Sequence, residues 1–104
     1  MPQVTRQTER VLVALLRDPA RHRYGLDLSR ETGLKSGTLY PILARLEGAG
    51  WVVSEWEEID PSAEGRRPRR YYRLTREGKR IARAAVEETE AHLRGLLRPE
   101  AETA

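Results

Sequence analysis

The 104-residue chain contains no cysteine and only two histidines, His22 and His92, which lie far apart in the sequence. Disulfide bonds, thiolate metal sites and cysteine nucleophiles are therefore excluded, and two isolated histidines do not form a metal cluster. The sequence also shows no nucleophile–base pair, no carboxylate pair in a fixed motif and no glycine-rich phosphate loop. These absences argue against an enzyme, and we predict no catalytic residue, metal site or cofactor.

Long apolar runs are missing as well. The chain has neither a signal peptide nor a stretch of about 18 apolar residues, which favours a cytoplasmic protein without a membrane partner. Its length allows one domain. Hydrophobic residues make up 38% of the chain and charged residues 34%, so the single chain buries a modest core and a partner subunit would add to its stability.

The charges are distributed unevenly, although the net charge is only +3. Segment 55–64 contains five acids and no base, whereas segment 66–80 contains eight bases and the single acid Glu77. Clustered cations create a local field that attracts a polyanion such as nucleic acid. A solvated charged loop is the alternative for any basic run, but the position of this run after a predicted helix-turn-helix argues against it.

Segment 35–47 has the pattern of a recognition helix. Four apolar residues at i, i+3, i+4 and i+7 form one buried stripe: Leu39, Ile42, Leu43 and Leu46. The other positions have small, hydroxyl, aromatic and cationic side chains, which allow close approach to a groove and contacts with phosphates or base edges. We predict DNA contacts from Lys35, Ser36, Thr38, Tyr40 and Arg45. Pro41 either opens the first turn toward the groove or is simply tolerated there.

A shorter helix is predicted just before this one, at 25–32, with Leu26 and Leu28 facing inward. Gly33 is expected to end it in the left-handed conformation. Ser36 is expected to cap the N-terminus of the longer helix. A short helix, a glycine-containing turn and a longer helix have the spacing of a helix-turn-helix motif.

Two predicted antiparallel strands, 51–56 and 69–74, and the polar loop between them form a wing. Trp51 and Trp56 are expected to pack in the wing and core rather than to bind a ligand. The loop ends in an extended arginine segment that suits the narrow minor groove of A·T-rich DNA. The predicted wing contacts are Arg66, Arg67, Arg69 and Arg70. The acidic half of the loop would repel phosphate, so it either points away or shields the arginines in the free protein.

The last predicted helix begins after its cap, Thr75, ends near Leu97 and allows close packing at Gly78. Its apolar stripe is longer than the head that it follows, so we predict a homodimer, with the first helix (4–17) as the other layer. The predicted dimer residues are Val11, Leu15, Ile81, Ala85, Thr89, His92, Leu93 and Leu96. A helix folded onto its own head is the alternative. The expected boundaries are a head at 1–78, a dimerisation helix at 79–97 and a frayed tail at 98–104.

Two motifs at this spacing closely resemble the PadR-like transcriptional regulators, namely G-T-L-Y-P-I-L-A-R-L-E at 37–47 and R-R-Y-Y-R-L-T-R-E-G at 69–78. The resemblance covers about residues 8–80, and the single terminal helix is similar to that of the short subfamily. It implies a homodimeric winged helix that binds an inverted-repeat operator, commonly as a repressor. Some short members bind flat aromatic or cationic compounds through a tryptophan on the terminal helix. This chain has none after Trp56, so we do not transfer that role.

The sequence therefore predicts a mainly α fold with a small β wing, a winged helix-turn-helix followed by a long C-terminal helix. The predicted function is sequence-specific binding of double-stranded DNA by a homodimeric regulator, with helix 36–49 in the major groove. One alternative is a winged-helix protein-interaction module whose basic wing binds an acidic partner. Another is a ligand-responsive regulator with a small-molecule effector in an apolar cleft between the subunits.

Overall fold

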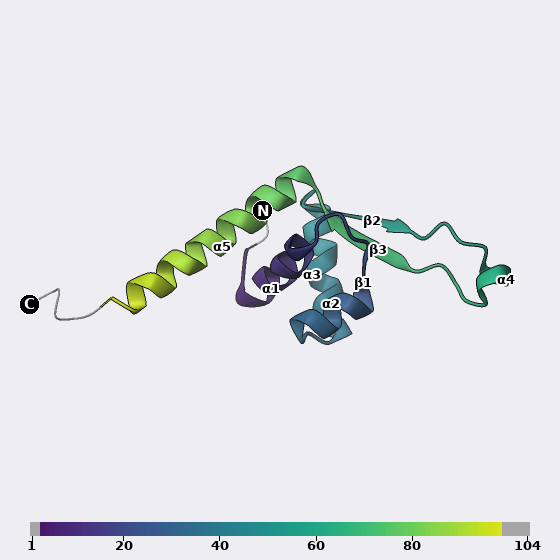
Figure 1. Ribbon diagram of the computed structural model, residues 1–104, viewed down its shortest axis with the longest axis horizontal. Coiled ribbons are helices and arrows are strands. Elements are labelled where there is room, and N and C mark those ends of the chain that lie inside the picture. Colours follow the sequence, from purple (N-terminus) through teal and green to yellow (C-terminus); the bar gives the residue numbers. More distant parts are fainter. Residues whose placement is uncertain (1–2, 99–104) are drawn as a thin grey trace, which may run out of the picture.

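The computed structural model describes residues 3–98. Its elements in chain order are α1 (Arg6–Arg17), β1 (Arg23–Tyr24), α2 (Gly25–Thr32), α3 (Ser36–Gly48), β2 (Val52–Trp56), α4 (Pro61–Glu64), β3 (Arg70–Leu74) and α5 (Arg76–Leu96). Helices α1, α2 and α3 pack with the sheet into a head (Figure 1). Helix α5 projects from one side of this head, and the β2–β3 hairpin projects from the opposite side. The predicted winged helix with a long terminal helix is confirmed.

The head is built on the apolar stripe of α3, which is buried as predicted. Val11 and Leu15 of α1 belong to the same core and are 0% and 1% exposed in the single chain. Both were predicted at the dimer interface, and the structure corrects that assignment because they have no surface left for a partner. Helices α2, α3 and α5 and strand β3 of the same chain pack against α1, so no partner subunit is needed to bury these two residues.

The sheet has the strand order β1-β3-β2, and both strand pairs are antiparallel. The β2–β3 hairpin follows the prediction, whereas the two-residue strand β1 was not predicted. One face of the hairpin buries Val52, Tyr72 and Leu74 against the helices. Trp51 is buried as predicted, whereas Trp56 lies in the wing beside Arg70 and is 62% exposed, so it does not add to the core.

Helix ends follow the predictions in part. Gly33 ends α2 with φ +72°, and the Thr75 hydroxyl accepts a hydrogen bond from the Gly78 amide at 3.0 Å. The N-cap of α3 is Lys35, and Ser36 is instead the first helical residue. Leu26, predicted to face inward with Leu28, is exposed. Residues two apart lie on different sides of a helix, so only one of the two leucines faces the core.

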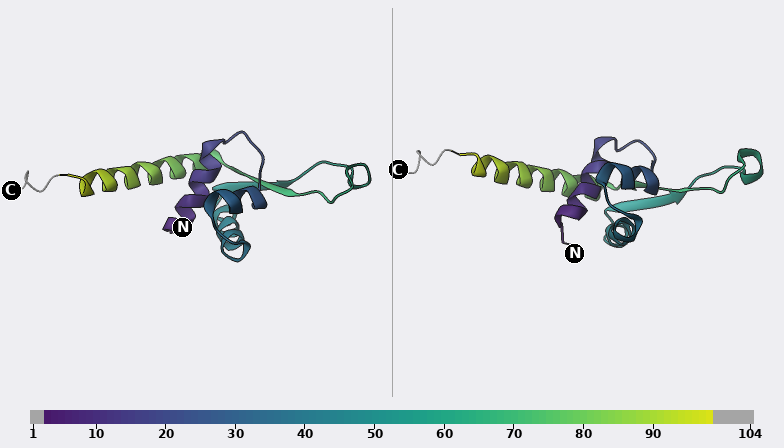
Figure 2. Two further views of the ribbon diagram at one scale, coloured as in Figure 1. Left: turned by 60° about the horizontal axis from the view of Figure 1, so that its bottom comes forward. Right: turned by 90° about the horizontal axis from the view of Figure 1, so that it is seen from below.

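Helix α5 is anchored to the head at its first turn. A Cβ on Gly78 would clash with the backbone carbonyl of Trp51, so this glycine permits the close packing that the sequence predicts. Gly78 and Ala82 are the buried residues of α5, and the helix then continues away from the head in all three views (Figures 1 and 2). The predicted boundary between 78 and 79 falls inside this continuous helix. Apart from Arg98, the predicted frayed tail lies outside the described residues.

A buried guanidinium joins three elements of the head. The Arg23 side chain is almost fully buried; its Nη1 donates to the Ala14 carbonyl at 2.5 Å, and it forms an ion pair with Glu31. Burial lowers the pKa of Arg23 from its usual value. These contacts hold the end of α1, helix α2 and strand β1 together. They therefore fix the position of α2, which precedes α3 in the chain.

Candidate nucleic-acid interface

The exposed side of α3 has cationic, hydroxyl and small side chains. Lys35, Ser36 and Arg45 are exposed and Thr38 is half-buried. Among the described residues, neither Lys35 nor Arg45 forms an ion pair. The acid in this helix is Glu47, whose carboxylate binds Ser54 and Arg70. Residues 3–98 thus leave the surface of α3 around Lys35 and Arg45 without a neutralising carboxylate, and this surface can accept phosphates.

Tyr40 lies on the exposed side of α3, where its ring extends across the start of α2. A Cβ on Gly25 would clash with the Tyr40 hydroxyl, so Gly25 makes room for the tyrosine. Nearly half of the Tyr40 side chain remains exposed. The two helices of the helix-turn-helix therefore meet at this pair, which fixes the tyrosine on the surface predicted to face DNA.

Two of the four predicted wing arginines are bound to Glu57, which directly follows β2. Arg66 donates from Nη1 to Oε1 at 2.6 Å and from Nη2 to Oε2 at 3.2 Å. Arg69 donates to Oε1 from its backbone amide at 2.8 Å and from Nε at 3.3 Å. The hydrogen bonds from Arg66 hold the pKa of Glu57 well below its usual range, and in return Glu57 raises the pKa of Arg66.

The other two arginines differ from this pair and from each other. Arg70 donates from Nε to the Ser54 hydroxyl at 2.8 Å, and its Nη2 lies 3.5 Å from a Glu47 oxygen. Its guanidinium carbon also lies 5.6 Å from the centre of the Trp56 ring, within cation–π range. Arg67 is exposed and forms no ion pair with any described residue. Three of the four arginines therefore have carboxylate partners in the free chain.

Tyr24 and Glu47 are residues of this site that sequence reasoning missed as binding partners, whereas Glu57 belongs to the acidic half of the loop that was expected either to point away or to shield the arginines. The Tyr24 hydroxyl donates to Glu57 Oε2 at 2.9 Å, which raises the pKa of the tyrosine. The hairpin register supplies a signal that could have identified Glu57. Trp56 pairs with Arg70, so the next residue on each strand brings Glu57 opposite Arg69, and opposite charges at facing positions attract.

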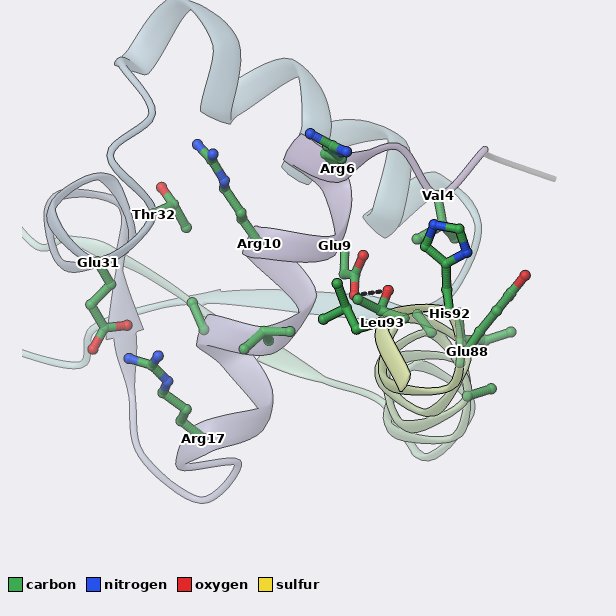
Figure 3. A pocket seen from close by; sticks show the side chains of 16 residues that line it. Val4, Arg6, Glu9, Arg10, Arg17, Glu31, Thr32, Glu88, His92 and Leu93 are labelled. Atoms are coloured by element: carbon green, nitrogen blue, oxygen red, sulfur yellow. Dashed lines mark hydrogen bonds between the residues drawn. The ribbon is translucent and has the colours of Figure 1, made fainter. Parts of the chain in front are cut away.

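A groove of about 870 Å³ lies between α1 and α5 (Figure 3). It is crossed by a hydrogen bond from the Thr89 hydroxyl to the Glu9 carboxylate at 2.6 Å. Five of the α5 residues predicted at a dimer interface line the groove: Ile81, Ala85, Thr89, His92 and Leu93. Leu93 and Leu96 are 52% and 69% exposed. The last turns of α5 therefore present apolar side chains that the single chain does not cover.

Residues 3–98 also lack two features of other functional classes. No group of three or more histidine, cysteine or acidic side chains there could hold a metal ion. None of the helices in this part of the chain combines the length and the apolar character needed to cross a membrane.

Comparisons with known proteins agree with this fold. The chain is 32% identical to a PadR family transcriptional regulator from Eggerthella lenta, covering 88% of this chain and 80% of that one, with a TM-score of 0.66. A PadR family regulator from Clostridium difficile is 23% identical over 88% of this chain and 95% of that one, with a TM-score of 0.74.

A third solved structure is that of NadR in complex with 4-hydroxyphenylacetate. It is 26% identical, with 88% of this chain and 60% of that chain covered and a TM-score of 0.67. No curated protein matches the sequence. The family model described as "Transcriptional regulator PadR-like family" matches residues 12–84. The family and the fold are those of transcriptional regulators, which are not enzymes. The chain belongs to the PadR-like family of transcriptional regulators.

Proposed function

We propose that the chain is a homodimeric repressor that binds a specific inverted-repeat operator in double-stranded DNA. The observation that supports this most directly is the exposed side of α3, where Lys35 and Arg45 have no ion-pair partner among the described residues. A cationic helix surface next to a wing suits a major groove, with the wing on the flanking backbone or minor groove. Such a regulator works where the chromosomal DNA is, in the cytoplasm.

The residues of the interface have different proposed roles. Lys35 and Ser36 at the start of α3 bind a phosphate, because a helix N-terminus favours anions. Thr38 and Tyr40 contact base edges or phosphates in the groove, and Arg45 binds a phosphate further along. From the wing, Arg67 contacts DNA directly, whereas Arg66, Arg69 and Arg70 reach DNA from positions fixed by their carboxylate partners.

The proposed dimer uses α5 as its main element. The groove beside α1, which has apolar and charged lining residues, and the exposed Leu93 and Leu96 together offer a surface to a second copy. The proposed interface consists of Ile81, Ala85, Thr89, His92, Leu93 and Leu96. In this proposal residues 1–78 form the DNA-binding head and 79–97 the dimerisation helix. A two-fold dimer places its two α3 helices on half-sites about one helical turn apart.

Selection of bound sequences from a pool of random duplexes tests this function. We expect enrichment of an inverted repeat with half-sites about 10 base pairs apart, centre to centre. The variant Lys35→Ala/Arg45→Ala should enrich it poorly, and so should each single replacement to a smaller extent, whereas Arg83→Ala, on the exposed surface of α5, should enrich it as well as the wild type. A pool that remains random would contradict operator binding, and it would favour a winged-helix module whose basic wing binds an acidic protein.

A ligand-responsive form of the same function is the second candidate. The groove between α1 and α5 has both apolar and charged lining residues, and it is large enough for a small organic molecule. NadR, a structural neighbour, was solved with 4-hydroxyphenylacetate bound. Calorimetric titration with this acid would show saturable binding if an aromatic acid is the effector. A groove variant, Val13→Arg, should then lose binding.

A further inference from the structure

Glu57 collects hydrogen bonds from three separate places in the chain. They come from Arg66 in the loop, from Arg69 just before β3, and from Tyr24 at the end of β1. A charged carboxylate is normally well exposed, yet only 10% of the Glu57 side chain is accessible. Five hydrogen bonds to one carboxylate fix the point at which the wing leaves the sheet.

The same cluster connects the wing to the helix-turn-helix. Tyr24 is the N-cap residue of α2, and its backbone amide donates to Asp27 Oδ2 at 3.2 Å. The Arg69 guanidinium carbon lies 4.2 Å from the centre of the Tyr24 ring, at cation–π distance. Because α2 leads directly into α3, a wing fixed to Tyr24 has a fixed direction relative to α3.

A carboxylate near DNA could instead act as a shield that phosphates displace from the arginines. Two of its partners argue against that role. The Arg69 backbone amide and the Tyr24 hydroxyl both donate to Glu57 within the base of the wing. A phosphate that displaced Glu57 from the arginines would also break these two hydrogen bonds, one of which comes from the half-buried Tyr24, and a half-buried donor without an acceptor is costly.

We propose that Glu57 is the positioning residue of the wing, which holds Arg66, Arg69 and Tyr24 together so that the wing and α3 bind one operator in a fixed relation. This role rests on the proposed function. Its effect is on discrimination between sequences, because the wing and α3 engage together on an operator, whereas non-specific binding needs only positive charge. Preorganisation of this kind raises affinity by lowering the ordering cost of binding.

The matched variants Glu57→Gln and Glu58→Gln test this role, because they remove the same charge at neighbouring positions. Glu58 is exposed and makes no hydrogen bond or ion pair with a described residue. The measured quantity is the ratio of affinities for the selected operator and for scrambled DNA at one salt concentration. We expect Glu57→Gln to lower this ratio about tenfold, Glu58→Gln to leave it unchanged, and Tyr24→Phe to lower it less.

The ratio separates positioning from simple loss of folded protein, which would reduce both affinities by the same factor. Limited trypsin digestion without DNA is the second readout, and we expect faster cleavage at the wing arginines in Glu57→Gln than in Glu58→Gln. An unchanged ratio and unchanged cleavage in Glu57→Gln would overturn the positioning role while leaving the proposed function intact. Tighter operator binding by Glu57→Gln would identify a shield instead. A wild-type protein without operator preference would overturn both proposals.

Discussion

Two glycines in this protein allow neighbouring parts of the chain to approach more closely than a side chain would permit. Gly78 brings the first turn of α5 against the backbone of Trp51, and Gly25 makes room for the Tyr40 hydroxyl. The first approach fixes the terminal helix on the head, and the second fixes a residue of the proposed DNA surface on α2. A backbone carbonyl cannot move aside as the end of a side chain can, so Gly78 is the less replaceable of the two.

Gly78→Ala should therefore destabilise the fold. Overpacking of this kind typically costs about 1–3 kcal/mol, and the gain in helix propensity of about 1 kcal/mol offsets part of that cost. The measurement is the free energy of unfolding from urea titration. Gly95→Ala in the same helix, where an added Cβ meets no atom, is the control and should be neutral or slightly stabilising. Equal effects at both positions would show that the contact with Trp51 is unimportant.

Glu57 also predicts a dependence of stability on pH. Its pKa in the folded protein lies far below its usual range, chiefly because of the hydrogen bonds from Arg66. The stabilisation is therefore fully present above the unfolded value of about 4.3 and is lost as the pH falls through the folded pKa.

The difference in unfolding free energy between wild type and Glu57→Gln should thus be constant from pH 7 to about pH 5 and shrink toward pH 2. Urea titrations at several pH values give this difference, with Glu58→Gln measured in parallel. A difference in unfolding free energy that stays constant down to pH 2 would mean that the arginine partners do not lower the pKa of Glu57 in the folded protein.

Among the elements, the wing has four arginines that are not equivalent. Arg66 and Arg69 bind Glu57, Arg70 binds Ser54 and Glu47, and Arg67 has no such partner among the described residues. In the sequence these four arginines form one basic run. The structure divides them into side chains that shape the wing and one that is already available to a phosphate.

Arg67→Ala should reduce the dependence of operator affinity on salt without changing stability. Loss of one phosphate contact lowers the slope of log affinity against log salt concentration by about 1. The measurement is a titration series from low to moderate salt, with Arg83→Ala as a control of equal charge change on α5. A slope that matches the wild type would remove Arg67 from the interface.

Local patterns predicted the elements better than the contacts between them. The stripe of α3, the cap at Thr75 and the turn at Gly33 depend on neighbours within a few residues, and all three are confirmed. Strand β1 has only two residues and exists through its pairing with β3, which no local pattern reveals. The same holds for the hydrogen bond between Tyr24 and Glu57, which lie 33 positions apart.

Burial was also misjudged where it depends on the whole fold. Most of the apolar residues of α1 are buried, as their spacing indicates. The spacing does not show whether they pack against other elements of the same chain or against a partner subunit. Val11 and Leu15 proved to be core residues. Trp56 lies where the hairpin extends past the helices, so a residue type that usually packs is left exposed.

On the scale of the whole molecule, α5 and the wing extend from opposite sides of the head (Figure 1). The terminal half of α5 therefore has little of the head to pack against, and Leu93, Leu96 and Leu97 are exposed. A second copy that covers these leucines and the groove beside α1 would remove their apolar surface from water, which favours association.

Replacing both Leu93 and Leu96 by aspartate should convert the proposed dimer into a monomer, because two charges would be buried without partners. Light scattering gives the mass directly. Ala91→Asp, an exposed position on the same helix that does not line the groove, is the control and should remain dimeric. A double variant of dimer mass would contradict the use of α5 as the main dimer element.

We propose that the chain recognises a specific operator through α3 and the wing, and a comparison of DNA affinities tests this recognition. The measurement compares the DNA upstream of the protein's own gene with scrambled DNA of equal length across a salt series. We predict a footprinted site bound about 10³-fold more tightly than scrambled DNA, with the preference retained as salt rises. Equal affinities for both DNAs that vanish together with added salt would contradict the claim, since they would reflect only non-specific attraction to phosphate.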